Sequence, residues 1–258
     1  MKRSDLICEN GVINDKQKGN FVHNFTLYRT NCAEMIIDKS LSEKTGKPVG
    51  RYVTIFCDEG DFRKCFIELL SSFLLKGTVL VAGLGNERIC SDSLGAASLR
   101  YIPATAHLSP HEAFKELSMR AVYVIEPGVM GKTGIESTAQ IKCISDKVKP
   151  DLIIAIDSLA CSDTDRLCRT IQITDAGIAP GAGVGNNRRA LDYDSVGVKV
   201  IAVGVPTVID YDENSGFMVT PRNIDTIIDE FSAVIGKGIS SALNPTLSAE
   251  ELLALTLL

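Results

Sequence analysis

The chain has 258 residues and a net charge of −5 at neutral pH; 45% of its residues are hydrophobic and 23% are charged. This length and composition fit one large globular α/β domain, or at most two small ones, and the lack of any block of lysines and arginines argues against nucleic acid as a direct partner. The sequence has neither an N-terminal apolar core of signal-peptide length nor a run of roughly 18 apolar residues that would span a bilayer. We therefore expect a cytosolic protein with no membrane partner.

The predicted elements begin after a polar, weakly patterned stretch. We expect residues 1–50 to be an irregular segment, with at most short strands over 24–28 and 34–37, packed on a single domain that spans 1–258. Strands are then predicted over 51–56, 78–82, 121–125, 152–156, 170–174 and 199–205, and helices over 62–75, 135–148 and 224–235. Ser109, followed by Pro110 and Glu112, is typical of a residue that caps a helix start. Strands that alternate with helices predict an α/β sheet with parallel, right-handed crossovers.

Eight cysteines and three histidines are spread along the chain. Without a signal sequence, and with no Cys-x-x-Cys pair, the cysteines are expected to be free thiols and not a disulfide framework. His107 and His111 are four residues apart, but Pro110 lies between them, and we expect both histidines at the surface. Three histidines alone do not make a zinc site.

The strand at 78–82 leads into a glycine-rich turn with the sequence GLGN, residues 83–86. In open α/β sheets, a turn at the carboxyl end of a strand presents backbone amides where ligands bind. The turn is not the dinucleotide-binding fingerprint, because Arg88 stands where the third glycine is required. Gly131–Lys132–Thr133 is not a Walker loop, because the glycine five residues upstream is missing. A tight turn after a buried strand is the structural alternative for GLGN.

Two aspartates follow apolar strands: Asp92 lies in the loop after 78–82, and Asp157 ends the run at 152–156. An acid at the end of a buried strand is costly unless it is hydrogen-bonded or paired. We expect these two carboxyl groups to meet at one edge of the sheet. Paired carboxyl groups have pKa values that are pushed apart, so one draws a proton from water while the other donates to a carbonyl or a leaving amine. A structural role, capping a helix or tying a loop, is the alternative.

Several long motifs, in the same order, resemble the germination protease family of spore-forming bacteria. The sequence GLGNERICSDSLGA at 83–96 is similar to the family pattern G-x-G-N-x-x-x-T-P-D-A-L-G-P, and PGVMGKTGIE at 127–136 is similar to P-G-V-x-G-x-T-G-I-E. Further matches are KPDLIIAIDSLA at 149–160, RTIQITDAGIAPGAGVGN at 169–186, VGVPTV at 203–208 and ALNPTL at 242–247. The resemblance covers most of the chain.

The resemblance implies an aspartic-type endopeptidase that degrades small acid-soluble spore proteins during germination, in the spore core. The two acids regarded as catalytic in that family fall on Asp92 and Asp157, which is the pair chosen from the strand pattern. The implied fold is a three-layer αβα domain of the phosphorylase/hydrolase-like type, with a mostly parallel mixed sheet. The family forms homotetramers, needs no metal or other cofactor, and is made as a zymogen with a short propeptide. Arg3–Leu6 resembles its early mature segment.

Backbone groups near the two glycine turns are expected to contact the substrate or the oxyanion, namely those of Gly83, Gly85, Asn86, Gly128 and Gly131. Two other functions stay open. The first is a metal-assisted endopeptidase of the hydrogenase-maturation type, to which the family is distantly similar. The second is a catalytically silent sporulation relative, because Cys90–Ser91 and Cys161–Ser162 depart from the family pattern beside both acids.

Overall fold

In the computed structural model of the protein, the described residues are 4–9, 21–181, 189–210 and 217–256. The strands are β1 (Val22–Leu27), β2 (Thr30–Ile37), β3 (Gly50–Phe56), β4 (Val79–Gly83), β5 (Val122–Ile125), β6 (Leu152–Cys161), β7 (Thr170–Thr174), β8 (Lys199–Asp210) and β9 (Met218–Val219). The α-helices are α2 (Lys39–Thr45), α3 (Phe62–Ser71), α4 (Leu94–Leu99), α5 (Glu112–Glu116), α6 (Met130–Thr133), α7 (Ser137–Val148), α8 (Tyr193–Val196), α9 (Ile224–Leu243) and α10 (Ala249–Thr256). Short 3-10 turns are η1 (Ile7–Glu9), η2 (Cys90–Asp92) and η3 (Ala106–Leu108).

Over the described residues, the strands form one nine-stranded mixed sheet in the order β1-β2-β3-β7-β8-β6-β4-β5, with β9 paired to β8. The pairs β4–β5, β4–β6 and β6–β8 are parallel. The pairs from β1 through β3 to β7, and those of β8 with β7 and β9, are antiparallel. The parallel unit places the carboxyl ends of β4 and β6 at one edge of the sheet, where the chemistry of α/β proteins is found.

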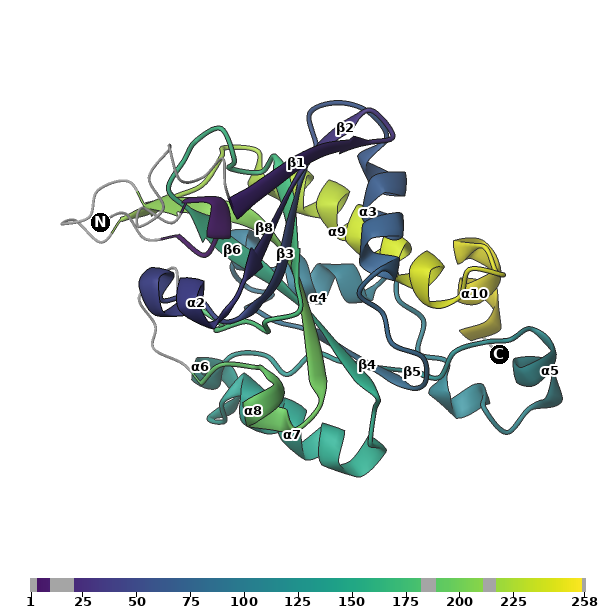
Figure 1. Ribbon diagram of the computed structural model, residues 1–258. Coiled ribbons are helices and arrows are strands. Elements are labelled where there is room, and N and C mark those ends of the chain that lie inside the picture. The colour runs from purple at the N-terminus through teal and green to yellow at the C-terminus, as the bar shows by residue number, and fades with distance from the viewer. Residues whose placement is uncertain (1–3, 10–20, 182–188, 211–216, 257–258) are drawn as a thin grey trace.

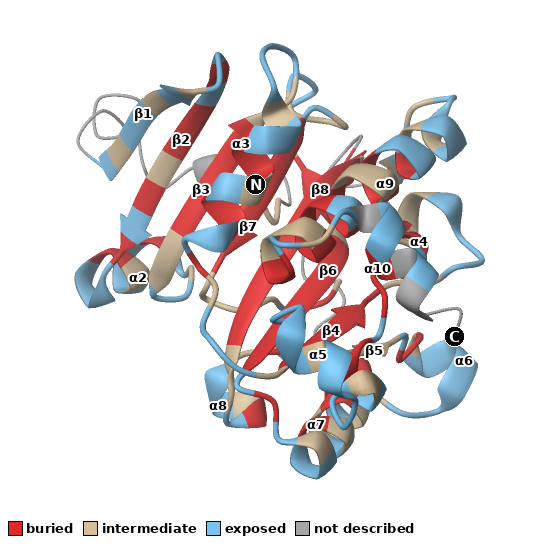
Figure 2. Ribbon diagram, turned by 90° about the vertical axis from the view of Figure 1, so that its right-hand side faces the viewer, coloured by how far each residue is buried: buried red, intermediate tan, exposed pale blue. Residues whose placement is uncertain are grey.

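Helices cover both faces of the sheet, which gives the molecule three layers (Figure 1). Side chains alternate between the two faces along each strand. In β4, Val79 and Val81 join the core beneath α3, α4 and α9, whereas Leu80 and Ala82 join the core beneath α7 and α8. Burial is continuous along the central strands (Figure 2). This arrangement confirms the predicted α/β class.

Residues before 50 are more regular than predicted, because they form β1, β2 and α2 and extend the sheet. Helix α2 begins after Asp38, whose side chain accepts a hydrogen bond from the backbone N of Leu41 at 2.8 Å, and ends at Gly46 in the left-handed conformation. The outermost strand, β1, has no buried residue, and in β2 the neighbours Cys32 and Ala33 are both buried, so burial does not follow a strict alternation. That weak alternation is why the sequence pattern indicated an irregular segment.

Several elements run further than predicted. β6 continues past Asp157 to Cys161, β8 continues past Pro206 to Asp210, and α9 continues to Leu243. A proline inside a strand is tolerated at an irregularity, and the pairing register shifts between Leu159 and Ala160, beside Pro206. Ser109 does not cap a helix start; it follows η3, and α5 begins at Glu112 after His111.

Within the described part of the chain, no helix has both the length and the apolar character needed to cross a membrane. The seven cysteines whose side chains are described are free thiols, which confirms the prediction for these residues. His107 and His111 are exposed, as expected.

Candidate active site

The glycines around the turn after β4 allow three backbone segments to pack in close contact. A Cβ at Gly95, near the start of α4, would lie 2.3 Å from Leu84 O and 2.5 Å from Ile156 O. A Cβ at Gly83 would lie 2.5 Å from Gly95 O. Contacts this short cannot form, so only glycine lets α4 lie directly across the ends of β4 and β6.

Asp92 is the last residue of η2, and α4 begins two residues later at Leu94. Its backbone O and its Oδ2 both accept hydrogen bonds from the backbone N of Asn86, at 2.9 and 3.0 Å. Gly85 has a φ of 96° and approaches so closely that a Cβ there would be 2.0 Å from Asp92 O. On the other side, the hydroxyl of Thr207, which is fully buried in β8, donates to Ser91 O at 2.6 Å. The turn that carries Asp92 is therefore fixed both to the end of β4 and to β8.

Asp157 lies inside β6, and not at its end as predicted. β4 stops at Gly83, one position before Asp157 in the register, whereas β8 continues with Gly204 opposite Asp157. The Asp157 side chain is 4% exposed, and its Oδ1 accepts a hydrogen bond from the backbone N of Ser158 at 2.9 Å. Because β4 ends there, one side of Asp157 has no neighbouring strand, and η2 packs against β6 at that place.

Asp92 and Asp157 line one cleft, with a volume of about 400 Å³. Its other walls come from the turn after β4, from Val129 and Gly131 at α6, and from Thr207 and Val208 of β8. The structure thus brings two acids that are distant in the sequence to the same cavity, at the edge of the sheet where they were expected.

Three of the five backbone positions expected to contact substrate line the cleft: Gly85, Asn86 and Gly131. Gly83 is buried beneath α4, and Gly128 uses its carbonyl to accept a hydrogen bond from the Ser137 hydroxyl at 2.6 Å. The backbone N of Asn86 already donates to Asp92, so this amide positions the acid. Gly85 and Gly131 are the other two of these positions in the lining of the cleft.

An ion pair joins two walls of the cleft. Lys132 Nζ, from α6, contacts Glu87 Oε1, from the turn after β4. The Lys132 ammonium holds the pKa of the Glu87 carboxyl below its usual range. The charge of Glu87 is balanced by Lys132.

The N-terminal segment contributes a cleft residue that sequence reasoning missed. Asp5 lines the cleft and is tied to β6, because its backbone N donates to Ala160 O at 2.9 Å and its Oδ2 accepts from the backbone N of Ala160 at 2.8 Å. Leu6 is fully buried beside it. Two hydrogen bonds from one residue to a distant strand leave no periodic pattern in the sequence. The only sequence signal near Asp5 was the resemblance of Arg3–Leu6 to the early mature segment of the family.

A cleft at the carboxyl edge of the parallel part of the sheet, with two carboxyl groups in its lining, places the protein among α/β enzymes suited to acid–base chemistry. Across the described ranges, no group of three or more histidine, cysteine, aspartate and glutamate side chains is arranged to hold a metal ion.

Known proteins identify the family. A family model described as germination protease matches residues 9–216. A germination protease of Clostridium tetani is 34% identical over 84% of this chain and 85% of the relative. One of Halalkalibacterium halodurans is 35% identical over 88% of this chain and 65% of the relative, and one of Bacillus cytotoxicus is 38% identical over 80% and 59%. The chain belongs to the germination protease family and is a peptidase, which confirms the resemblance seen in the sequence.

Proposed function

We propose that the protein is an aspartic-type endopeptidase that hydrolyses small acid-soluble spore proteins during germination, with Asp92 and Asp157 as its catalytic pair. One observation carries the assignment of the residues: two acids far apart in the sequence line a single cleft. Family membership supports the peptidase activity and the link to germination. The family also supports a place in the spore interior and a homotetrameric assembly.

The proposed mechanism uses the two carboxyl groups as a pair. The ionised group takes a proton from a water molecule as that water attacks the peptide carbonyl, and the protonated group donates to the leaving amine. The backbone amides of Gly85 and Gly131 lie in the same cleft and would stabilise the oxyanion or orient the peptide. A coupled pair of this kind gives a bell-shaped dependence of rate on pH.

The test is cleavage of a purified small acid-soluble spore protein by the wild type and by Asp92→Asn and Asp157→Asn. Each substitution keeps the shape of the side chain but removes its proton-transfer role. We expect kcat to fall by roughly 10²–10⁴ in each variant. Full activity in either variant would remove that residue from the mechanism.

The matched control is Asp146→Asn, which makes the same chemical change on an exposed residue of α7 that pairs with Lys142. This variant should cleave like the wild type. Circular dichroism and thermal unfolding of all three variants separate loss of chemistry from loss of fold. Cleavage fragments mapped by mass spectrometry establish whether the cuts are internal, as an endopeptidase requires.

A further inference from the structure

Two buried cysteines from different elements meet in the core, on the face of the sheet that α3 covers. Cys32 lies near the start of β2, and Cys65 lies near the start of α3. Their sulfur atoms are 3.4 Å apart, and the two residues are 2% and 0% exposed. The mechanism proposed above uses neither of them.

The two sulfur atoms are positioned to form a covalent bond. Sulfur atoms in a disulfide are about 2.05 Å apart, so the present contact would have to shorten by about 1.4 Å. At 3.4 Å the sulfurs touch, and no other side chain separates them. The Cys32 thiol also donates to the backbone O of Thr30 at 3.7 Å, which helps to orient its sulfur.

The contact prepares one of the two sulfurs as a nucleophile. The hydrogen bond from the Cys65 thiol holds the pKa of Cys32 below its ordinary value, and the same hydrogen bond, together with burial, raises the pKa of Cys65. The thiolate is the reactive form of a cysteine. Burial raises the pKa of the neighbouring Cys57 to about 12, so this third thiol stays protonated at neutral pH. Cys32 is therefore the sulfur that attacks an oxidant first.

The outer hairpin gives a small oxidant a route to the pair. β1 is the strand beside Cys32 at the edge of the sheet, with Phe25 opposite Cys32 in the register. No residue of β1 is buried. Elements with few buried contacts open locally more often than central strands do. Opening of β1 thus exposes Cys32 while the middle of the sheet stays folded.

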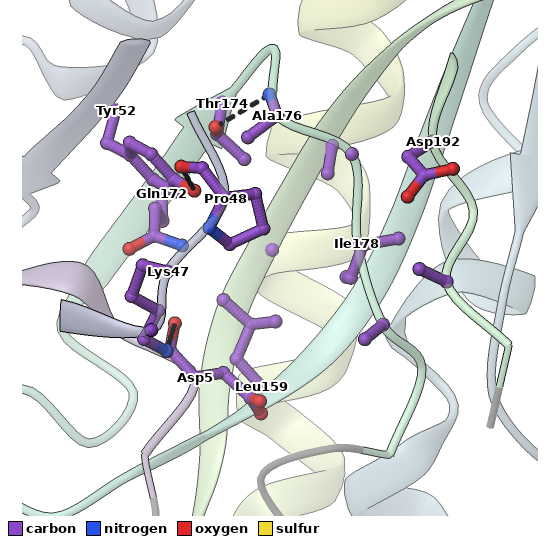
Figure 3. A pocket seen from close by; sticks show the side chains of 16 residues that line it. Asp5, Lys47, Pro48, Tyr52, Leu159, Gln172, Thr174, Ala176, Ile178 and Asp192 are labelled. Carbon is purple, nitrogen blue, oxygen red and sulfur yellow. Dashed lines mark hydrogen bonds between the residues drawn. The ribbon is translucent and has the colours of Figure 1, made fainter. Parts of the chain in front are cut away.

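The pair lies apart from the cleft and from a second cavity next to the cleft. Figure 3 shows this second cavity, which is lined by Gln172 and Thr174 of β7. Ile173, between them, packs in the same core as Cys32, so the cavity and the cysteine pair are on opposite faces of the sheet. The described linings of the cleft and of the second cavity contain no cysteine. A bond between Cys32 and Cys65 therefore leaves the cleft open.

We propose that Cys32 and Cys65 form a site of oxidative modification, at which hydrogen peroxide produces an intramolecular disulfide that stabilises the folded protein. The Cys32 sulfur attacks one oxygen of the peroxide, the O–O bond breaks, and Cys32 becomes a sulfenic acid while one water leaves. The Cys65 sulfur then attacks the Cys32 sulfur, the S–O bond breaks, and a second water leaves with the remaining thiol proton. The two sulfurs lose two electrons, and the peroxide gains them.

The disulfide would tie the outer hairpin to α3. A disulfide stabilises mainly by restricting the unfolded chain, and the effect grows with the length of the closed loop. The two cysteines are 33 positions apart, and the loop between them contains β3. Both belong to the main hydrophobic core, together with residues of the central strands. The oxidised protein should therefore have a Tm roughly 5–10 °C above that of the reduced protein.

The experiment treats the folded, full-length protein with a small molar excess of hydrogen peroxide. The product is denatured, alkylated, digested and analysed by mass spectrometry. We expect a peptide pair joined through Cys32 and Cys65, with the mass of the two peptides less two hydrogen atoms. Calorimetry of the same samples should show the rise in Tm, and treatment with dithiothreitol should return the Tm to that of the reduced protein.

Cys65→Ala removes one sulfur of the pair, so peroxide should neither link Cys32 to another peptide nor raise the Tm of this variant. If Cys65→Ala does not fold, Cys32→Ala takes its place. Cys143→Ala is the matched control, because it makes the same change at an exposed thiol of α7 and should form the link and gain Tm like the wild type. Absence of the Cys32–Cys65 link in the oxidised wild type, a link to Cys57 in its place, or a linked protein that melts no higher than the reduced one would overturn the proposal.

Discussion

The surroundings of Asp157 follow from two neighbouring strands of unequal length. β4 ends at Gly83 while β8 continues to Asp210, so Asp157 has a paired strand on one side and the cleft on the other. The acid is 4% exposed, yet it lines the cleft. A strand that ended at Asp157, as the sequence pattern predicted, would not have given the cleft its β6 floor at Leu159.

The fold gives no structural reason for the hydroxyl group of Ser158. Its hydroxyl is buried at the cleft, and no hydrogen-bond partner is found for it among the described residues. An unpaired buried hydroxyl costs roughly 1–3 kcal/mol. We expect Ser158→Ala to unfold at the same urea concentration as the wild type or at a higher one.

Ser137→Ala is the contrasting variant for stability, since the Ser137 hydroxyl lines the same cleft but donates to Gly128 O at 2.6 Å. Its loss should lower the free energy of unfolding by about 1 kcal/mol. If Ser158→Ala lost as much stability as Ser137→Ala, the Ser158 hydroxyl would have a partner in solution.

At the residue scale, the sequence predicted the two acids but not their surroundings. Asp92 and Asp157 could be chosen because each follows an apolar strand. Asp5 and Thr207 could not, because their roles depend on a few long-range hydrogen bonds, two between Asp5 and Ala160 and one from Thr207 to the backbone of Ser91. Such contacts leave no pattern in the sequence.

At the scale of elements, α4 holds the site together. It is only six residues long, yet it packs on β4, β6 and α9 and begins two residues after Asp92. Gly95 permits this packing, because any Cβ there would collide with Leu84 and with the backbone O of Ile156. The position of Asp92 relative to Asp157 therefore depends on this contact.

Gly95→Ala should push α4 away from the sheet and displace Asp92. We expect lower stability and a loss of kcat for spore-protein cleavage that persists well below the unfolding temperature. The control is Gly238→Ala in α9, where a Cβ would lie 2.6 Å from ring atoms of Phe66. That variant should also lose stability but should keep its kcat when measured below its unfolding temperature. Equal kcat in the two variants would show that α4 does not set the position of Asp92.

The central strands and the longer helices were predictable, because apolar runs such as Leu152–Ile156 and the spacing within α3 are strong signals. Their ends were not. β6 and β8 remain paired with each other beyond Asp157 and Pro206, so both strands are longer than predicted. α9 is longer than predicted because it packs against α3 and α4. These extensions depend on tertiary contacts, which a local pattern does not contain.

At the scale of the whole molecule, buried thiols link stability to pH. Burial, reinforced by the charge of Glu9, raises the pKa of Cys161 from its ordinary value of 9.0 to about 12. Burial, reinforced by Asp58, raises the pKa of Cys57 to about 12, and burial alone raises that of Cys168 to about 11. The folded protein therefore keeps protons that the unfolded chain releases above about pH 9.

This stabilisation is complete below pH 9 and is lost as the pH rises from 9 toward 11 and 12, because only the unfolded chain then gains by releasing its thiol protons. The free energy of unfolding should fall by at most about 1.4 kcal/mol per pH unit for each thiol. Urea unfolding at a series of pH values measures this slope. In Cys161→Ala, the free energy of unfolding should fall less steeply with pH, by the contribution of one thiol. An unchanged slope would contradict the raised pKa of Cys161.

The order of strands in the sheet also bears on when activity first arises in the cell. β6 is flanked by β4, made early, and by β8, which ends only at Asp210 and supplies Thr207 and Val208 to the cleft wall. A nascent chain that is still short of β8 on the ribosome has no complete cleft, since parallel pairing over long sequence separations forms late. A chain made only as far as β7 therefore lacks the part of the cleft wall that β8 supplies, and the proposed mechanism would have to wait for that strand.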